Sequence, residues 1–179
     1  MGIFSQFRLV AVYAAFLLIP CAYLTFILAS NIFALVKGRK AEFAYGMVTF
    51  VMTLLAGAAY FLNFGWFRMF LILLFIEQCV IVYVLARISA QRTKESKWLT
   101  ASVIGMYITS FTCWFFLPDG GDDGGARLFF SLFTSDDFNV ESIYIYLTAI
   151  ISFLLFHGLT YVIITLKIVY ALKPKKQGN

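Results

Sequence analysis

Five long apolar runs, separated by short stretches that hold most of the charges, constrain this chain more than any other feature. A helix needs about 20 residues, at 1.5 Å each, to cross the hydrocarbon core of a bilayer. In lipid the backbone must satisfy its own hydrogen bonds, which a helix does within one segment. The sequence therefore predicts an all-α integral membrane protein, a single polytopic bundle of five transmembrane helices. The expected spans are about 9–36, 43–63, 66–86, 98–117 and 142–172.

The composition supports the same class of protein. Of the 179 residues, 62% are hydrophobic and 13% are charged, against roughly 45–50% and about 25% in soluble domains. A soluble chain of this length cannot bury so much apolar surface, so the lipid bilayer is the first expected partner. The net charge of +5 comes from short basic clusters between the apolar runs. These clusters are typical of membrane topology signals, and no nucleic-acid partner is predicted.

The number of spans has one alternative. The second and third runs are joined by a very short turn containing Asn63 and Gly65, so they could form a broken hairpin that does not fully cross, leaving four spans. Connections of two to eight residues between helices are ordinary, and we expect five. The first and last runs exceed the bilayer thickness and must tilt, kink or project beyond it. Pro20 is a candidate kink site.

The distribution of Lys and Arg predicts the orientation. With five spans, eleven of these residues fall on one side of the membrane and three, Arg8, Arg68 and Arg127, on the other. Positive residues mark the cytoplasmic side. We therefore expect the N-terminus outside and the C-terminus inside, in a plasma or inner membrane rather than an organellar one.

A polar pair interrupts the third run. Glu77 and Gln78 lie side by side within LLFIEQCVIVY, and the lone histidine, His157, lies within the fifth run. Ionisable residues inside spans are costly, usually face the bundle interior and mark functional sites. We expect Glu77 to be buried, with His157 as its first partner and with Gln78 and Asn31 as further polar lining.

The polar group has three interpretations. The first is helix packing by interhelical hydrogen bonds, worth about 1 kcal/mol each. The second is a proton relay, because a buried Glu–His pair can share a proton. The third is a lateral contact, in which Glu77 reaches the helix of a partner subunit.

The connection 118–141, expected outside, holds six of the nine acids and a short apolar stretch, ARLFFSLF. That stretch is too short to span and is typical of an interfacial or re-entrant segment. The loop could instead dock a partner. The candidate contact residues are Asp119, Asp122, Asp123, Arg127, Phe129, Phe130, Phe133, Asp136 and Asp137.

No pattern of catalytic or cofactor-binding residues is present. One histidine cannot supply the two axial ligands of a bis-histidine haem. Cys21, Cys79 and Cys113 lie scattered in apolar runs, without the spacing of a zinc site. The sequence predicts no enzyme activity, no cofactor and no metal site.

Two families share coarse features with the chain. In span number, orientation and length it is similar to the five-helix small membrane subunit of respiratory complex I, although Glu77 and Gln78 stand where that family has a glycine-bearing third helix. In size and composition it is similar to membrane immunity proteins against pore-forming bacteriocins. Neither likeness includes a motif, so no residue role is transferred.

We expect a non-enzymatic membrane protein that acts as a small subunit or accessory partner of a larger membrane complex. One alternative is a small proton-coupled carrier or channel that uses Glu77 and His157. The other is a membrane-embedded immunity or inhibitor protein that recognises its partner through 118–141.

Overall fold

The fold is that of a computed structural model. It describes the backbone of residues 3–62, 68, 70–90, 97–120, 126–128, 133–134 and 142–172, and the side chains of 18, 20–62, 68, 70–90, 97–118 and 144–171. Within these residues, long helices form the bundle and three very short strands lie at one of its ends. The helices are α1 (Ile3–Val36), α2 (Lys40–Leu62), α4 (Ile72–Ala90), α5 (Lys97–Phe116) and α6 (Ser142–Leu172).

Among the described residues, four helices are long and apolar enough to cross a membrane. They are α2, α4 and α5 over their full lengths and α6 over Tyr144–Ala171. The apolar part of α1 for which side chains are described, Pro20–Val36, is shorter than a full span. The helix itself continues through Pro20 without interruption. The chain is thus a multi-pass helical membrane protein.

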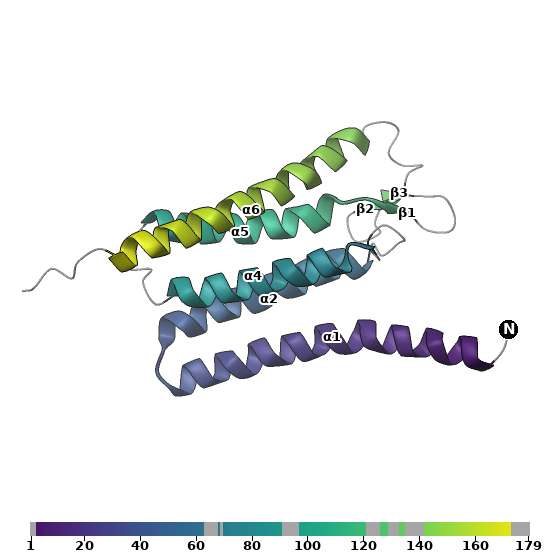
Figure 1. The fold of residues 1–179 in the computed structure, drawn as a ribbon, viewed down its shortest axis with the longest axis horizontal. Coiled ribbons are helices and arrows are strands. Elements are labelled where there is room, and N and C mark those ends of the chain that lie inside the picture. Colours follow the sequence, from purple (N-terminus) through teal and green to yellow (C-terminus); the bar gives the residue numbers. More distant parts are fainter. Residues whose placement is uncertain are drawn as a thin grey trace, which may run out of the picture.

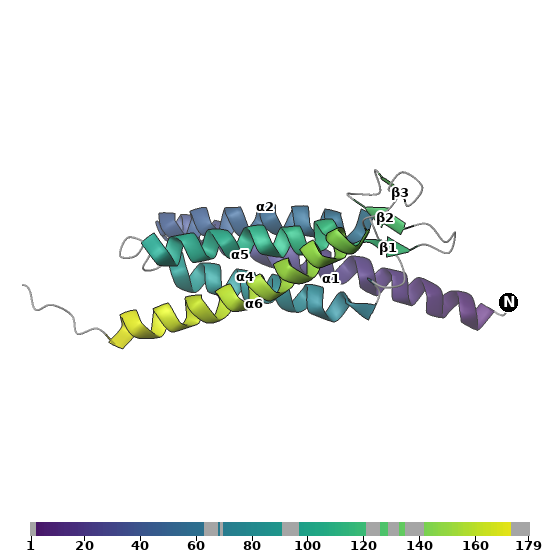
Figure 2. The ribbon, with the colours of Figure 1, turned by 90° about the horizontal axis from the view of Figure 1, so that it is seen from above.

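The helices run up and down side by side, as Figures 1 and 2 show. In Figure 1, α6 and α5 form the upper pair, α4 and α2 lie below them, and α1 forms the lower edge. The short strands and the N-terminal end of α1 lie at the same end of the bundle, which we call the sheet end. The opposite end, where α1 ends and α2 begins, carries Lys37, Arg39 and Lys40 and is called the basic end.

The turn from α1 into α2 is fixed by backbone hydrogen bonds. The N–H of Gly38 donates to the carbonyl of Leu35 at 2.9 Å, and the N–H of Arg39 donates to that of Ala34 at 2.9 Å. This pair of bonds is a Schellman motif, which needs a left-handed residue just after the helix. Gly38 provides it with a φ of 68°. A glycine at this point lets the chain reverse after one short turn.

Two clusters of buried side chains hold the helices together. Towards the sheet end, the ring of Tyr60 stacks on Phe75, with centroids 4.4 Å apart, and meets Trp114 edge-on at 5.1 Å. Such pairs add about 0.5–1.5 kcal/mol beyond area burial. Towards the basic end, aliphatic residues of α4 and α5 pack around Phe156 and Ile163 of α6. The aromatic cluster joins α2, α4 and α5, and the aliphatic cluster joins α4, α5 and α6.

The connection after α5 contains a small antiparallel sheet in place of a purely irregular loop. Its strands are β1 (Asp119–Gly120), β2 (Ala126–Leu128) and β3 (Phe133–Thr134), in the order β1-β2-β3. Arg127 pairs with Asp119 on one side and with Thr134 on the other. The expected interfacial stretch, ARLFFSLF, thus contributes two strands, and its middle residues lie outside the described part.

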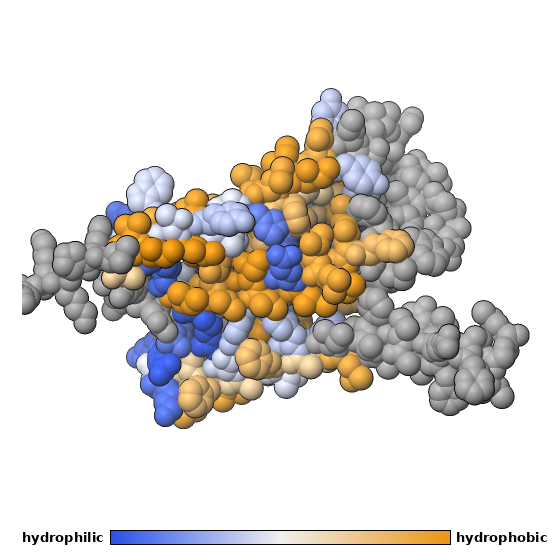
Figure 3. Space-filling view, in the orientation of Figure 1, coloured by the Kyte–Doolittle hydropathy of each residue, from blue (hydrophilic) through white to orange (hydrophobic). Residues whose placement is uncertain are grey.

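The outward faces of the helices are strongly apolar. Large hydrophobic side chains are exposed along every described helix, for example Leu73 on α4 and Leu154 on α6. In Figure 3 orange residues cover much of this surface, with paler residues among them along α6. Blue residues gather near the basic end, and one blue patch lies near the middle of the α4 and α6 face. Lipid is the solvent that such a surface suits.

A glycine on α2 makes room for an asparagine on α1. A Cβ placed on Gly46 would overlap the side-chain carbonyl of Asn31, which is fully buried. Small residues of this kind let membrane helices approach closely. The α1–α2 contact therefore depends on the missing side chain at position 46.

Replacing Gly46 with Ala should lower the free energy of unfolding in detergent by about 1–3 kcal/mol, because the added methyl displaces Asn31. The matched control is Gly158→Ala on α6, where an added Cβ meets nothing within 4 Å. The control should be neutral or stabilising, because Ala favours a helix over Gly by about 1 kcal/mol. Thermal or SDS denaturation compares the two. Equal effects would contradict the close contact.

Candidate functional site

The two neighbouring polar residues of α4 point in different directions. Gln78 is 1% exposed, and its Oε1 accepts hydrogen bonds from Trp114 Nε1 at 2.9 Å and Ser110 Oγ at 3.4 Å. Glu77 is exposed. Successive residues of a helix are 100° apart, so the inward position of Gln78 turns Glu77 away from α5. Gln78 therefore binds α4 to α5.

Glu77 belongs to an outward-facing stripe of α4. The apolar members of this stripe are Leu73, 74% exposed, and Val80, Val84 and Ile88, each between 42% and 45% exposed. With Glu77 they follow helical spacing, so they form one continuous face. Glu77 forms no hydrogen bond or ion pair with any other residue that the structure describes. The expectation that Glu77 is buried is wrong, because the hydrophobic residues of α4 left no sign of which side faces inward.

His157 lies beside this stripe without being bonded to Glu77. It is half-buried, with its ring against Phe153 at 4.5 Å and Phe156 at 5.2 Å. Phe153, one turn earlier, packs on the aromatic cluster that contains Phe75 of α4. Ile81, one turn after Glu77, packs on the aliphatic cluster that contains Phe156. Both polar residues thus border the seam between α4 and α6.

The seam is where Figure 3 shows its hydrophilic patch. In the middle parts of α4 and α6, the strongly polar residues that are exposed or half-buried are Glu77 and His157. Glu77 is the sixth residue of α4, about 8 Å along the axis from Ile72. It therefore lies in the half of the helix nearer the sheet end, one turn inward from the exposed Leu73.

Asn31 lies elsewhere, in a polar cluster near the basic end. Arg87 of α4 donates to Asn31 Oδ1 at 3.2 Å and to Ser30 Oγ at 2.5 Å. Tyr83 also donates to Ser30, at 2.7 Å. The expected grouping of Asn31 with Glu77 and His157 is wrong, because the guanidinium of Arg87 holds Asn31 near the other end of α4. The cluster fastens α1 to α4.

The same guanidinium reaches α2. Arg87 Nη1 lies 3.4 Å from Glu42 Oε2, and Arg39 Nη1 lies 3.5 Å from the same oxygen. The side chains of Arg87 and Glu42 are 16% and 15% exposed. A partly buried pair of this kind is screened less than a surface pair. The Arg87 cluster thus connects α1, α2 and α4 through one cation.

At the sheet end, a second arginine, which is buried, also connects helices. Arg68, 0% exposed, donates to the carbonyls of Ala59 at 2.5 Å and Tyr60 at 3.2 Å, near the end of α2. It also donates to the carbonyls of Trp114 at 2.8 Å and Leu117, at the end of α5. The last carbonyls of a helix lack partners and carry about half a negative charge. Arg68 therefore caps two helices at once.

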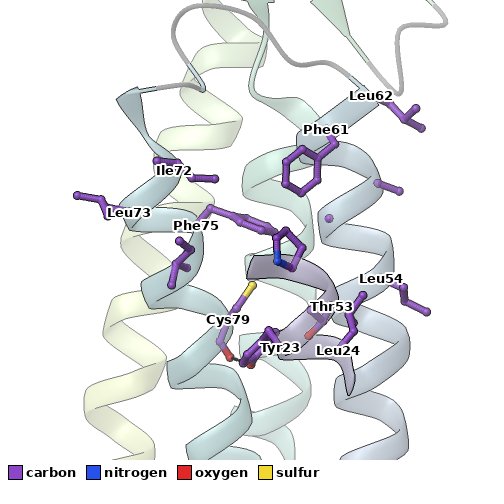
Figure 4. Close-up of a pocket in the computed structure, with 14 residues that line it drawn as sticks. Tyr23, Leu24, Thr53, Leu54, Phe61, Leu62, Ile72, Leu73, Phe75 and Cys79 are labelled. Atoms are coloured by element: carbon purple, nitrogen blue, oxygen red, sulfur yellow. Dashed lines mark hydrogen bonds between the residues drawn. The ribbon is translucent and has the colours of Figure 1, made fainter. Parts of the chain in front are cut away.

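An apolar cavity of about 720 Å³ lies between α1, α2 and α4 (Figure 4). Among its lining residues are Pro20 and Tyr23 of α1, Phe61 of α2, and Phe75 and Cys79 of α4. The Tyr23 hydroxyl donates to the carbonyl of Cys79 at 2.5 Å. None of Glu77, Gln78 and His157 lines the cavity. This space has the chemistry of lipid hydrocarbon and lacks that of an ion pathway.

The candidate contact residues of the 118–141 connection fall partly outside the description. Asp119, Arg127 and Phe133 lie in β1, β2 and β3, and Asp119 stands opposite Arg127 in the strand register. The remaining six lie outside the described residues: Asp122, Asp123, Phe129, Phe130, Asp136 and Asp137. The partner-contact hypothesis for this loop stays a prediction.

In the part of the chain that is described, no three His, Cys, Asp or Glu side chains are grouped closely enough to hold a metal ion. Cys21, Cys79 and Cys113 are free thiols, of which Cys21 is exposed. The polar groups in the described helices mostly bind one helix to another.

Comparison of the chain with protein-family models, with curated proteins and with solved structures finds no match. No family match therefore supports the likenesses in size and topology that were noted for the sequence. The site has to be interpreted from its own geometry.

Arg68 and Arg87 are the polar residues that the sequence-based reasoning missed. Arg68 was counted only as an outside charge, and Arg87 only as an inside one. For Arg87 the one hint is Glu42, an acid in the first turn of α2 beside a basic cluster, but Arg39 of that cluster also reaches it. For Arg68 the sequence offers none, because its role depends on where the chain turns between α2 and α4.

Replacing Arg68 with Met should destabilise the protein by roughly 3 kcal/mol, because four helix-terminal carbonyls lose a charged donor inside the protein. The control is Arg39→Met, whose side chain is 54% exposed and which should change stability by about 0.5 kcal/mol or less. Denaturation in mixed micelles measures both. A similar small change for the two variants would contradict the capping role.

Proposed function

We propose that this protein is a small, non-enzymatic subunit or accessory partner of a larger membrane complex, and that it binds this complex through the lipid-facing side of α4 and the adjoining edge of α6. The observation that carries the proposal is Glu77, an exposed acid on an otherwise apolar helix face.

The topology in this proposal has five crossings. α2, α4, α5 and α6 supply four, and α1, with 34 residues, is long enough to supply the fifth. The N-terminus is outside and the C-terminus inside, in a plasma or inner membrane. Lys37, Arg39, Lys40, Arg87 and Lys97 all lie towards the basic end, which supports placing that end on the cytoplasmic side.

The environment of Glu77 supports a protein partner over lipid alone. A charged residue costs about 2.5–3.5 kcal/mol at the centre of a membrane helix, and less towards the interface. Gln78 and Arg87 of the same helix reduce this cost by making hydrogen bonds within the chain. Glu77 is exposed and has no such bond within the described residues. A second polypeptide on this face would supply one.

The carrier alternative finds less support. A conduit needs polar groups that face a common, hydrated space. Gln78 is bonded to Trp114, and Asn31 to Arg87, while the described cavity is apolar. Glu77 and His157 lie at the outer seam of α4 and α6, and neither lines this cavity.

Topology is tested with reporters fused after Asn179. Green fluorescent protein, which folds in the cytoplasm, should fluoresce in this position, and alkaline phosphatase, which needs an oxidising compartment, should be inactive. A fusion before Met1 should give the opposite pattern, because five crossings place the ends on opposite sides. The same pattern at both ends would leave an even number of crossings and contradict the proposal.

The subunit role is tested by extracting tagged protein from its own membrane into polymer nanodiscs and measuring the mass of each particle. We expect a stoichiometric complex whose protein mass exceeds the 20.3 kDa chain by at least one further polypeptide. Val84→Trp on the exposed stripe should reduce the complex, and Ile108→Trp, on the exposed side of α5, should not. A single chain in all particles would overturn the proposed function.

A further inference from the structure

We infer that the partner contributes a transmembrane helix whose Lys or Arg, in the half of the span nearer the sheet end, pairs with Glu77. This inference rests on the proposed function and names the chemistry of the partner at that site. It is carried by three features of the described chain: the spacing of the stripe, the exposed carboxyl group of Glu77 and the surroundings of His157.

The stripe has the geometry of a helix-packing surface. Leu73, Glu77, Val80, Val84 and Ile88 recur every three or four residues along α4. This is the periodicity with which two helices pack in parallel or antiparallel fashion. The β-branched Val80, Val84 and Ile88 have few rotamers. They therefore lose little side-chain freedom when a helix packs against them. A helix therefore fits this face better than an irregular segment.

The carboxyl group of Glu77 selects the partner's chemistry. A carboxylate in an apolar setting is best stabilised by a charge-assisted hydrogen bond from a guanidinium or ammonium group. Another acid would repel it, and an aliphatic side chain would leave it unsatisfied. The basic groups of this chain that are described on α4 and α6, Arg87 and Lys167, lie towards the basic end. Within the described residues no Lys or Arg pairs with Glu77, so we assign the cation to the partner.

A second copy of this chain fits the face less well. In a twofold symmetric dimer the same surface meets itself, so two stripes in contact would place Glu77 close to the Glu77 of the other copy. His157 offers little relief, because its ring is packed between Phe153 and Phe156.

The experiment uses the full-length protein in its own membranes, with a photo-crosslinking amino acid at Val80, one turn from Glu77. A second chain carries the same amino acid at Ile108, on the exposed side of α5, as the matched control. After irradiation the adduct is purified, and the crosslinked peptide is identified by mass spectrometry. We expect Val80 to label one apolar segment of about 20 residues with a Lys or Arg within two turns of the labelled residue. Ile108 should not label that segment.

Glu77→Gln keeps the size of the side chain and removes its charge. It should reduce the Val80 adduct about tenfold, the size of effect expected for one interhelical polar contact. Glu77→Lys should abolish the adduct, and changing the partner's basic residue to Glu should restore it. The amount of folded protein in each sample is checked by its elution from a sizing column.

The possible outcomes separate the inference from the proposed function. A partner segment without a basic residue, or an adduct unchanged by Glu77→Gln, overturns the inference and leaves the subunit role standing. A Val80 adduct with a second copy of this chain overturns the inference in favour of self-association. Adducts with lipid alone at Val80, together with a single-chain mass in nanodiscs, overturn both.

Discussion

The lack of water inside a bilayer is the constraint on which the rest of this structure depends. Polar groups that enter the hydrocarbon must find partners in protein. Several of the buried polar groups described here meet this demand by binding one helix to another: Arg68 joins the ends of α2 and α5, and Gln78 joins α4 to α5 through its Oε1. Gln78 Nε2 and Ser89 Oγ are buried without a hydrogen-bond partner among the described residues. Thr49 and Tyr107, 2.8 Å apart, join α2 to α5. Polar contacts thus join α1, α2, α4 and α5 to one another, whereas α6 packs on α4 and α5 through apolar side chains such as Phe156 and Ile163.

The two arginines show how this constraint is met at opposite ends. Arg68 satisfies carbonyls that the ends of α2 and α5 leave without partners. Arg87 collects side-chain oxygens from α1 and α2. Arginine suits both tasks because its planar guanidinium presents several donors in fixed directions and remains charged. Where α1 borders the apolar cavity, few polar groups connect it to α2 and α4. The Arg87 cluster near the basic end is therefore the strongest described polar attachment of α1.

The fold class could be predicted from the sequence, and the direction in which individual residues point could not. Bilayer thickness sets the length of a span, so the apolar runs revealed the helices. However, α4 is apolar on nearly all sides, since protein interior and lipid accept the same side chains, and its sequence contains little information on rotation. Glu77 and Gln78 were therefore indistinguishable until Trp114 and Ser110 were placed beside one of them. In the same way, the partner of Asn31 could not be predicted, because it depends on how far α1 is shifted along its axis relative to α4.

Whether the Glu77 face is covered in the native membrane is the question that decides the proposed function most directly. A nitroxide at residue 80, in a chain whose three cysteines are changed to alanine, reports collisions with oxygen dissolved in lipid. In nanodiscs cut from the native membrane, we expect collisions as rare as for a nitroxide at the buried Val82. When the purified chain is reconstituted into lipid without a partner, we expect collisions as frequent as for a nitroxide at the exposed Ile108. Frequent collisions in both preparations would show that the face meets lipid, and would contradict a partner helix at Glu77.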